Sequence, residues 1–333
     1  MKYILIPFFG MVIALVAVEA VVRIMTAMAP SETAWSDRPR AYYKPELSQT
    51  LQDQPYSVVK PANTFRIAVI GDSFTFAPHM QFDDAFPKKL ERMLNLNNIV
   101  DKVEVVNYGV PGYSTKHEVK VMRQAIAEQA DLVILQLTLN DPEAKPYRPS
   151  GLKGINRFGK FLPTKSQRKL FSYWKTAELI AQRLHNSRTH ARYIKYYFKF
   201  NSKPRRWDRF KAYLKTIAKL SNESSVPLVA TIFPLFGLPL DDRYPFHPLH
   251  GSIADIFQEL NIPYLDLFDA FKHIPLPRIQ IIPGVDFHPN EIGHRIAAEH
   301  IYDWLTDAQL IPQEFIIKDK FETRTDIRVM VLE

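Results

Sequence analysis

Four short motifs contain the residue types needed for chemistry at an ester carbonyl. They are Gly71–Thr75 (Gly-Asp-Ser-Phe-Thr), Asn107–Gly112 (Asn-Tyr-Gly-Val-Pro-Gly), Asn140-Asp141, and Asp286–Asn290 (Asp-Phe-His-Pro-Asn). The first supplies a serine, the last supplies a histidine and an acid, and the other two supply hydrogen-bond donors. A serine hydroxyl is a weak nucleophile that needs an adjacent base, and the oxyanion it creates needs donors. Together the motifs predict acyl transfer through a serine.

Each motif taken singly has a structural alternative. Asp72 and Ser73 could cap a helix or a turn, Gly112 could be a turn glycine, and Asn140 could be a loop or cap residue. His288 could be a loop histidine ahead of a helix. However, the motifs follow apolar runs of the chain. In an open α/β sheet the loops after such strands meet at one edge, which favours the catalytic interpretation.

Five apolar runs predict the strands of that sheet. They are residues 65–70, 103–106, 131–137, 226–233 and 263–267. Apolar residues at helical spacing predict a helix over 83–95, one near 207–220, one ahead of the fifth run, and one opened by Asn290. The alternation of strands and helices predicts an α/β fold with parallel strands and right-handed crossovers.

The motifs resemble those of the SGNH, or GDSL-type, serine esterase and lipase superfamily. The resemblance covers about Phe65–Asp141 and Val226–Leu305. It implies a flavodoxin-like three-layer α/β/α sandwich with a parallel central sheet. It also implies an enzyme that hydrolyses esters without a cofactor.

The resemblance implies a role for each residue that matches a family motif. Ser73 would be the nucleophile, His288 the general base, and Asp286 the acid that orients the imidazole. The backbone N–H groups of Ser73 and Gly112 and the side chain of Asn140 would form the oxyanion hole.

Two positions depart from the family pattern. The third block usually reads Gly-x-Asn-Asp, but Thr138 stands in the glycine position, where its side chain could narrow the pocket. The acid usually stands three residues before the histidine, where this chain has Val285. Asp286 is two residues before His288, and residues two apart in an extended chain point to the same side, so their contact is expected. Related envelope O-acetyltransferases resemble this chain in using an Asp-x-His pair.

A long apolar segment predicts a membrane anchor at residues 4–22. The run Ile4–Val18 is uninterrupted, and the whole segment has about the length that a bilayer span needs. Lys2 ahead of it favours an inside N-terminus, with the catalytic domain outside the cytoplasmic membrane, in the periplasm or at the cell surface. The alternative is a cleavable signal peptide ending at Ala27–Ala29, a site that Pro30 disfavours.

The net charge of +8 conceals an uneven distribution. Residues 151–215 contain 18 Lys or Arg against two acids, so the rest of the chain is acidic. Aromatic residues alternate with these cations over 192–200. This basic insertion fits a helix on an anionic membrane, a lid, a groove for an acidic glycan, or a solvated helical pair packed on the catalytic domain. Nucleic acid is not expected as a partner of a chain facing outward.

The absence of cysteine excludes disulfides and a thiol nucleophile. No HExxH-like spacing is present, and we expect no metal; the alternative is a histidine–carboxylate site around His247, His250, Asp286 and His288. Two further histidines, His294 and His300, are interpreted as solvated or structural.

The predicted organisation has four parts. Residues 1–29 form a signal anchor, 30–62 a linker, 63–310 the SGNH hydrolase domain with a basic helical insertion at about 145–206, and 311–333 a tail of unassigned role.

Three functions remain open from the sequence. The first is a serine esterase acting on acetyl or short acyl esters of an envelope glycan or lipid. The second is an O-acyltransferase that passes the acyl group to a glycan. The third is a non-catalytic binding module on the same fold.

Overall fold

A computed structural model of the protein describes residues 2–28, 53, 55–96, 102–142, 161, 163–283 and 286–315. The segments outside the described residues include the greater part of the predicted linker, residues 143–160 with the start of the predicted insertion, Val285, and the tail beyond residue 315. The predicted domain boundaries therefore stay predictions.

The core of the molecule is a five-stranded parallel sheet. Its strands are β1 (Thr64–Gly71), β2 (Lys102–Gly109), β3 (Leu132–Leu137), β4 (Leu228–Ile232) and β5 (Tyr264–Asp266). The strand order β2-β1-β3-β4-β5 is the flavodoxin-like order, in which the crevice for a ligand lies between β1 and β3 at the carboxyl edge. The predicted fold class is confirmed.

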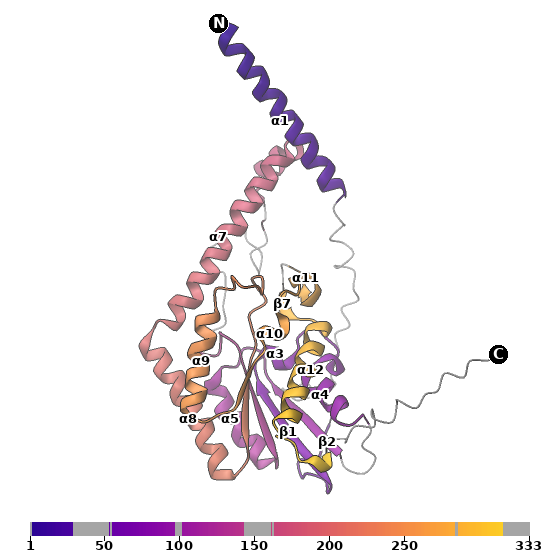
Figure 1. Ribbon diagram of the computed structural model, residues 1–333, viewed down its shortest axis with the longest axis vertical. Coiled ribbons are helices and arrows are strands. Elements are labelled where there is room, and N and C mark those ends of the chain that lie inside the picture. The colour runs from indigo at the N-terminus through magenta and orange to yellow at the C-terminus, as the bar shows by residue number, and fades with distance from the viewer. Residues whose placement is uncertain are drawn as a thin grey trace, which may run out of the picture.

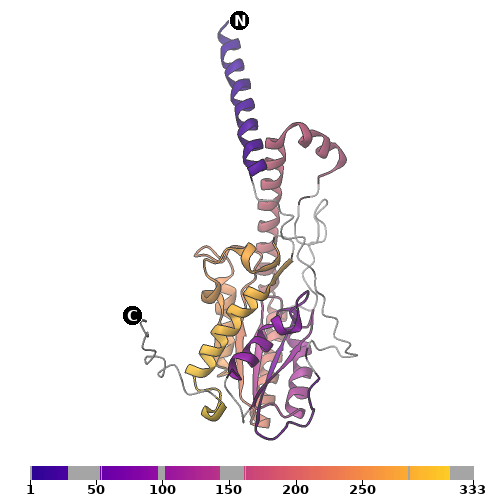
Figure 2. The ribbon, with the colours of Figure 1, turned by 90° about the vertical axis from the view of Figure 1, so that its right-hand side faces the viewer.

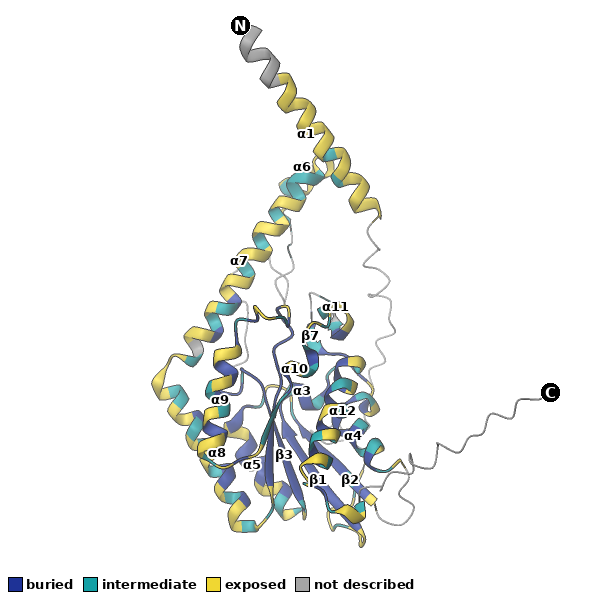
Figure 3. Cartoon of the chain, viewed as in Figure 1, coloured by how far each residue is buried: buried dark blue, intermediate teal, exposed yellow. Residues whose placement is uncertain are grey.

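Helices cover both faces of the sheet, which explains why its central strands are apolar throughout. Every residue of β1, β3 and β4 is buried. Two helices, α4 (Phe86–Leu94) and α12 (Glu291–Asp307), pack together over one face. The helices α5 (Thr115–Ala127) and α8 (Pro204–Ser224) pack together over the other, and α9 (His247–Glu259) lies ahead of β5 (Figure 1). Figure 3 shows the buried residues concentrated on the sheet between these layers.

Two element boundaries differ from the prediction for identifiable reasons. The second strand extends through Asn107 to Gly109, because the buried Asn107 amide bonds the Thr75 carbonyl at 3.0 Å and so satisfies its polar atoms inside the core. The helix predicted over 83–95 is divided into η1 (Phe82–Asp84) and α4, with Ala85 extended between them. Pro87 explains the division, since a proline is tolerated only in the first turn of a helix.

Small elements at the carboxyl edge of the sheet complete the domain. They are α3 (Ser73–Phe76), α10 (Phe268–Phe271), α11 (Leu276–Ile279), β6 (Gln280–Ile282) and β7 (Asp286–Pro289), with η2 (Gln313–Phe315) near the end of the described chain. The antiparallel pair β6–β7 was not predicted from sequence, because each strand is too short to have a pattern. This pair carries His288.

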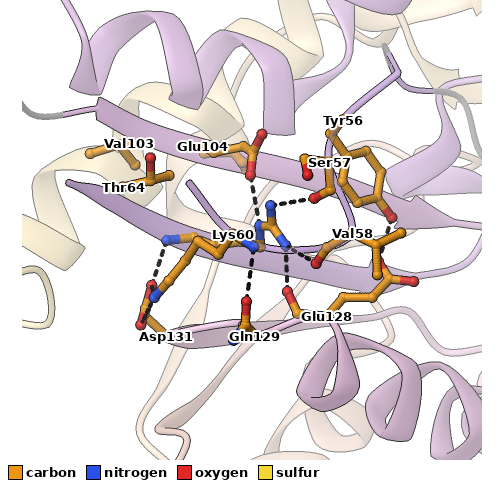
Figure 4. A network of polar contacts seen from close by, with 12 residues as sticks. Tyr56, Ser57, Val58, Lys60, Thr64, Val103, Glu104, Glu128, Gln129 and Asp131 are labelled. Atoms are coloured by element: carbon orange, nitrogen blue, oxygen red, sulfur yellow. Dashed lines mark hydrogen bonds and ion pairs between the residues drawn. The ribbon is translucent and has the colours of Figure 1, made fainter. Parts of the chain in front are cut away.

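A buried cation closes the opposite, amino edge of the sheet. Arg66 on β1 is fully buried, and its guanidinium donates to Glu104 at 2.6 Å and to the Ser57 carbonyl at 2.7 Å. It also donates to the Val58 and Glu128 carbonyls. Figure 4 shows this cluster of polar contacts.

Three helices lie apart from the sheet. The helix α1 (Lys2–Met28) contains a stretch, Phe9–Met28, whose mean hydropathy of 2.1 and length fit a membrane span, and none of it is buried. The insertion forms α6 (Lys165–Tyr173) and the long α7 (Lys175–Asn201). Figure 2 shows α7 extending from the catalytic domain toward α1.

Candidate active site

The first motif forms a tight turn between β1 and α3. Asp72 precedes the helix as its cap, and its carboxylate accepts a hydrogen bond from the Phe74 N–H at 2.8 Å. Glycine is required at position 71, because an added Cβ would lie 2.4 Å from both the Gln136 Oε1 and the Thr75 Oγ1 atoms. This packing places Ser73 at the first position of α3, at the carboxyl edge of the sheet.

The structure brings His288 to Ser73 across 215 positions of the chain. The His288 Nε2 atom lies 2.9 Å from the Ser73 hydroxyl oxygen. On the other side of the ring, Nδ1 lies 2.6 Å from a carboxylate oxygen of Asp286. When Nδ1 donates to this carboxylate, Nε2 is left as the acceptor for the serine proton. The contact predicted between residues two apart in an extended chain is present.

The electrostatics keep Asp286 ionised. Burial of this carboxyl opposes ionisation, but the hydrogen bonds and charge of His288 outweigh it and lower the pKa of Asp286 below its ordinary value. His79 adds to this effect, since its Nε2 lies 3.9 Å from the second carboxylate oxygen. An ionised carboxylate at this position stabilises the imidazolium that forms when His288 takes a proton.

The candidate oxyanion donors differ in their present partners. Within the described chain, neither the Ser73 N–H nor the Gly112 N–H donates a hydrogen bond, and Gly112 has a φ of 80°, which favours glycine. The Asn140 amide nitrogen donates to Asp72 at 2.9 Å. A primary amide nitrogen has two hydrogens, so one remains for another acceptor.

Thr138, which stands where the family usually has glycine, is fully buried. Its hydroxyl is turned toward the carboxyls of Asp72 and Asp141, at 3.4 and 3.5 Å. Its backbone N–H donates to Asp141. The extra side chain therefore belongs to the support of the turn that carries Asn140.

Three buried carboxyls lie behind the candidate site. Asp72, Glu118 and Asp141 are at most 2% exposed. Burial and the charge of Asp72 raise the pKa of Glu118 to about 8. Burial and the charge of Glu118 raise the pKa of Asp141 well above its ordinary value, and burial raises that of Asp72. Among the described residues, no lysine or arginine pairs with any of them.

Sequence reasoning missed three residues of this region. Gln136 accepts hydrogen bonds from the Asp72 N–H and the Thr75 hydroxyl, and a buried polar residue in an apolar strand was the signal that could have found it. Glu118 lies on α5 and resembles any acid on the outer face of a helix. His79 lies in the turn after α3 and belongs to no motif.

Of the other histidines considered from the sequence, three have structural surroundings and one is exposed. His250 bonds Asp266 at 2.9 Å, and the His247 ring packs against Phe268. His294 is fully buried, accepts from the Phe86 N–H, and has its pKa lowered to about 3 by burial, whereas His300 is exposed. Across the described segments, no group of three histidine or acidic side chains is arranged to hold a metal ion.

The basic insertion reaches the edge of this site. Tyr193 on α7 is buried, and its ring lies 6.4 Å from that of Phe287, the residue between Asp286 and His288. An added Cβ at Gly237 would lie 2.8 Å from the Tyr193 hydroxyl, so the contact is close. The predicted packing of the insertion on the catalytic domain by its aromatic residues is therefore present at this end of α7.

The chain belongs to the GDSL-like lipase/acylhydrolase family, whose model matches residues 69–296. It is an ester-hydrolysing enzyme by this membership, as the motifs predicted. No curated protein sequence matches the chain.

Solved structures of esterases are similar in fold. The psychrotrophic esterase EstA from Pseudoalteromonas sp. is 14% identical, with a TM-score of 0.44 over 74% of this chain and 99% of that chain. A mutant of Axe2, an acetyl-xylooligosaccharide esterase from Geobacillus Stearmophilus, is 15% identical, with a TM-score of 0.45 over 72% of this chain and 93% of that chain. The acetyl xylan esterase AlAXEase is 13% identical, with a TM-score of 0.43 over 72% of this chain and 100% of that chain.

Proposed function

We propose that this protein is a serine esterase, anchored in the cytoplasmic membrane by α1, that hydrolyses acetyl or short acyl esters outside that membrane. The observation that carries the proposal is the continuous contact from Asp286 through His288 to Ser73, at 2.6 and 2.9 Å. Both distances are within the range in which a proton can pass.

In the proposed first step, the Ser73 oxygen attacks the ester carbonyl carbon while its proton passes to the His288 Nε2 atom. The carbonyl π electrons move to the oxygen, and the resulting oxyanion is held by the N–H groups of Ser73 and Gly112 and by Asn140. When the carbonyl re-forms, the C–O bond to the alcohol breaks and the alcohol takes the proton from His288. An acyl group then remains bonded to Ser73.

In the second step water replaces the alcohol. His288 accepts a proton from water as the water oxygen bonds the acyl carbon, and the bond to Ser73 then breaks as the serine regains a proton. The products are a carboxylic acid and the free enzyme. Asp286 holds the imidazole in one tautomer throughout and stabilises its charged form.

The proposed location rests on α1, which is apolar, exposed and long enough to cross a bilayer. The proposed substrate, an ester-bearing envelope glycan or lipid, follows from that location and from the family. A cleaved signal sequence would leave the same domain outside the membrane but unanchored.

Two measurements on the full-length protein in detergent test the proposal. A fluorophosphonate probe should label the wild type and the Ser202→Ala variant, whose substituted serine is exposed, but not Ser73→Ala. A series of p-nitrophenyl esters should be hydrolysed fastest at acetyl or butyryl length. Labelling of Ser73→Ala at the wild-type rate would contradict the assignment of the nucleophile.

A second candidate, an O-acyltransferase, uses the same residues with a glycan hydroxyl in place of water. The Asp-x-His spacing of residues 286 and 288 is the observation that favours it. Mass spectrometry of envelope glycans from a deletion strain separates the two: an excess of acyl groups indicates an esterase, and a deficit indicates a transferase.

A further inference from the structure

The two ends of α7 have different surroundings. Near its C-terminal end, Tyr193 and Tyr197 are buried, and their rings lie within 6 Å of that of Phe246 in the catalytic domain. Its N-terminal end reaches α1, as Figures 1 and 2 both show. A helix of 27 residues is about 40 Å long at 1.5 Å per residue. The helix therefore spans the distance between the domain and α1.

Glu19 of α1 holds the N-terminus of α7. Its carboxylate accepts hydrogen bonds from the N–H groups of Lys175 and Thr176, both at 2.8 Å, and from the Thr176 hydroxyl at 2.7 Å. The first N–H groups of a helix lack partners within the helix, and its N-terminus favours negative charge. The residue before α7, Trp174, provides no side-chain cap, so Glu19 performs this role from 155 positions away.

Arg23 strengthens the same junction. It pairs with Glu19 at 2.8 Å and donates to the Tyr173 carbonyl at 2.9 Å, where α6 ends. The turn between α6 and α7 is thereby fixed at the level of Glu19 on α1. Glu19 and Arg23 are the charged residues that follow the uninterrupted apolar run of α1.

The residues around this turn expose large apolar side chains. We call residues 165–184, which comprise α6 and the first turns of α7, the tip segment. Within it, five large apolar side chains are between 45% and 72% exposed, whereas Phe171 is buried; the five are Leu170, Tyr173, Trp174, Ile180 and Leu184. Solvated helices seldom expose so many apolar side chains at neighbouring positions.

The tip segment is also basic. It contains five cations and one acid, Glu178, which is paired with Lys175. The other cations are Lys165, Arg168, Lys169 and Arg183. Exposed Trp, Tyr and Leu beside Lys and Arg are the composition of a helix that lies in the headgroup layer of an anionic membrane.

We infer that the tip segment is a second membrane contact, seated in the anionic headgroup layer on the side of the catalytic domain. The inference rests on the proposed anchoring by α1. In this arrangement the uninterrupted apolar run Ile4–Val18 lies in the hydrocarbon and Glu19 lies at its outer boundary. The contacts of Glu19 and Arg23 with the turn between α6 and α7 therefore set the depth of the tip segment. Figure 1 shows α3 and β7, which carry Ser73 and His288, at the end of the domain that faces α1. The helix α7 would therefore hold the catalytic edge of the sheet toward the membrane surface.

The absence of cysteine from the chain allows a direct test. Single cysteines replace Leu170 on the tip segment, Ile13 on α1, or Lys219 on the exposed face of α8, and each is labelled with an NBD fluorophore. The full-length proteins are inserted singly into nanodiscs of zwitterionic lipid, with or without phosphatidylglycerol. Brominated lipids then quench the labels that enter the bilayer.

The expected result is quenching and a blue shift at positions 13 and 170 and neither at 219, with the effect at 170 greater when phosphatidylglycerol is present. Addition of Glu19→Ala should reduce quenching at 170 and leave that at 13 unchanged. Quenching at 13 without quenching at 170 overturns the inference and leaves the anchor intact. Lack of quenching at 13 overturns the anchor and the inference together.

Two other outcomes also contradict parts of the inference. Equal quenching at 170 with and without phosphatidylglycerol would show that the tip segment does not require anionic headgroups. A signal at 170 that arises only when two chains share a nanodisc would assign the tip segment to contact with a second copy.

Discussion

The two edges of the central sheet handle buried charge in opposite ways. At the amino edge, the Arg66 guanidinium is surrounded by acceptors, with Glu104 and three backbone carbonyls bonded to it. At the carboxyl edge, Asp72, Glu118 and Asp141 are buried together, and burial raises their pKa values. At the amino edge the acceptors satisfy the positive charge of Arg66. At the carboxyl edge burial disfavours the ionised form of the three carboxyls.

This difference indicates that the amino edge contributes mainly to the stability of the fold and the carboxyl edge mainly to catalysis. A saturated buried cation is costly to disturb, so the amino edge holds the sheet together. Crowded carboxyls near a candidate active site cost stability, and such cost is commonly found where function requires a particular arrangement. We therefore expect substitutions at the carboxyl edge to lower turnover and substitutions at the amino edge to lower the free energy of unfolding.

The largest effect is expected for Ser73→Ala. Turnover of a short acyl ester should fall at least about 10⁴-fold, as in other serine triads. The free energy of unfolding should change by less than about 0.5 kcal/mol, because the Ser73 hydroxyl bonds only His288 among the described side chains. Asp286→Ala should cost less turnover. Steady-state kinetics and urea unfolding check both values, and full activity in Ser73→Ala would contradict the proposed function.

Arg66→Met should have the opposite effects, lowering the free energy of unfolding but not turnover. The change leaves the Glu104 carboxylate, whose side chain is 12% exposed, and the carbonyls of Ser57 and Val58 without their donor, and should lower the free energy of unfolding by about 3–5 kcal/mol. Turnover per folded molecule should be unchanged. The matched control is Arg295→Met, which breaks an exposed pair with Glu299 and should cost at most about 0.5 kcal/mol. Urea unfolding measures both values. If the two variants lost the same free energy of unfolding, the stabilising role of Arg66 at the amino edge would be contradicted.

Glu118→Gln tests the carboxyl edge through the pH dependence of the free energy of unfolding. The folded-state pKa of Glu118 is raised to about 8, so the native state binds a proton that the unfolded state releases above its ordinary value of 4.5. Stability is therefore full at low pH and declines as pH rises from about 4.5 to 8. Replacing the acid by its neutral isostere should remove roughly 2–4 kcal/mol of that decline. Thermal unfolding of the wild type and the variant at pH 5 and pH 8 measures the decline in stability. If the variant lost as much stability between the two pH values as the wild type, the prediction would be refuted.

The smallest effect is expected for Lys60→Met at the amino edge. Lys60 pairs with Asp131 at 2.6 Å, but both side chains are partly exposed, so water replaces much of the interaction. The free energy of unfolding should fall by about 0.5–1 kcal/mol. Urea midpoints at low and high salt provide the measurement, and a loss as large as that for Arg66→Met would show that the Lys60 pair is not screened.

Much of the fold followed from patterns in the chain. The apolar runs predicted all five parallel strands, because a strand covered on both faces must be apolar along its whole length. The helix boundary at Ala85 was missed because apolar spacing continued through Pro87. The β6–β7 pair was missed because strands of three and four residues have too few positions for a period.

The sequence predicted some residues of the candidate site but not others. Residues inside motifs, such as Ser73, Gly112 and His288, could be proposed for the site because their chemistry and their place after strands agree, and the structure brings Ser73 and His288 into contact. Gln136 and Glu118 were missed, because their role depends on burial against Asp72 and Thr75. Single residues carry no sign of what packs against them.

The sequence by itself determined where the parallel strands lie along the chain and which polar motifs follow them, since both depend on local composition and on the alternation of strands and helices. Only the tertiary structure decided which polar groups meet: His288 with Ser73, the three buried carboxyls with one another, and Glu19 with the start of α7. Such contacts join positions far apart in the chain, and whether a charge is buried or paired depends on everything that surrounds it.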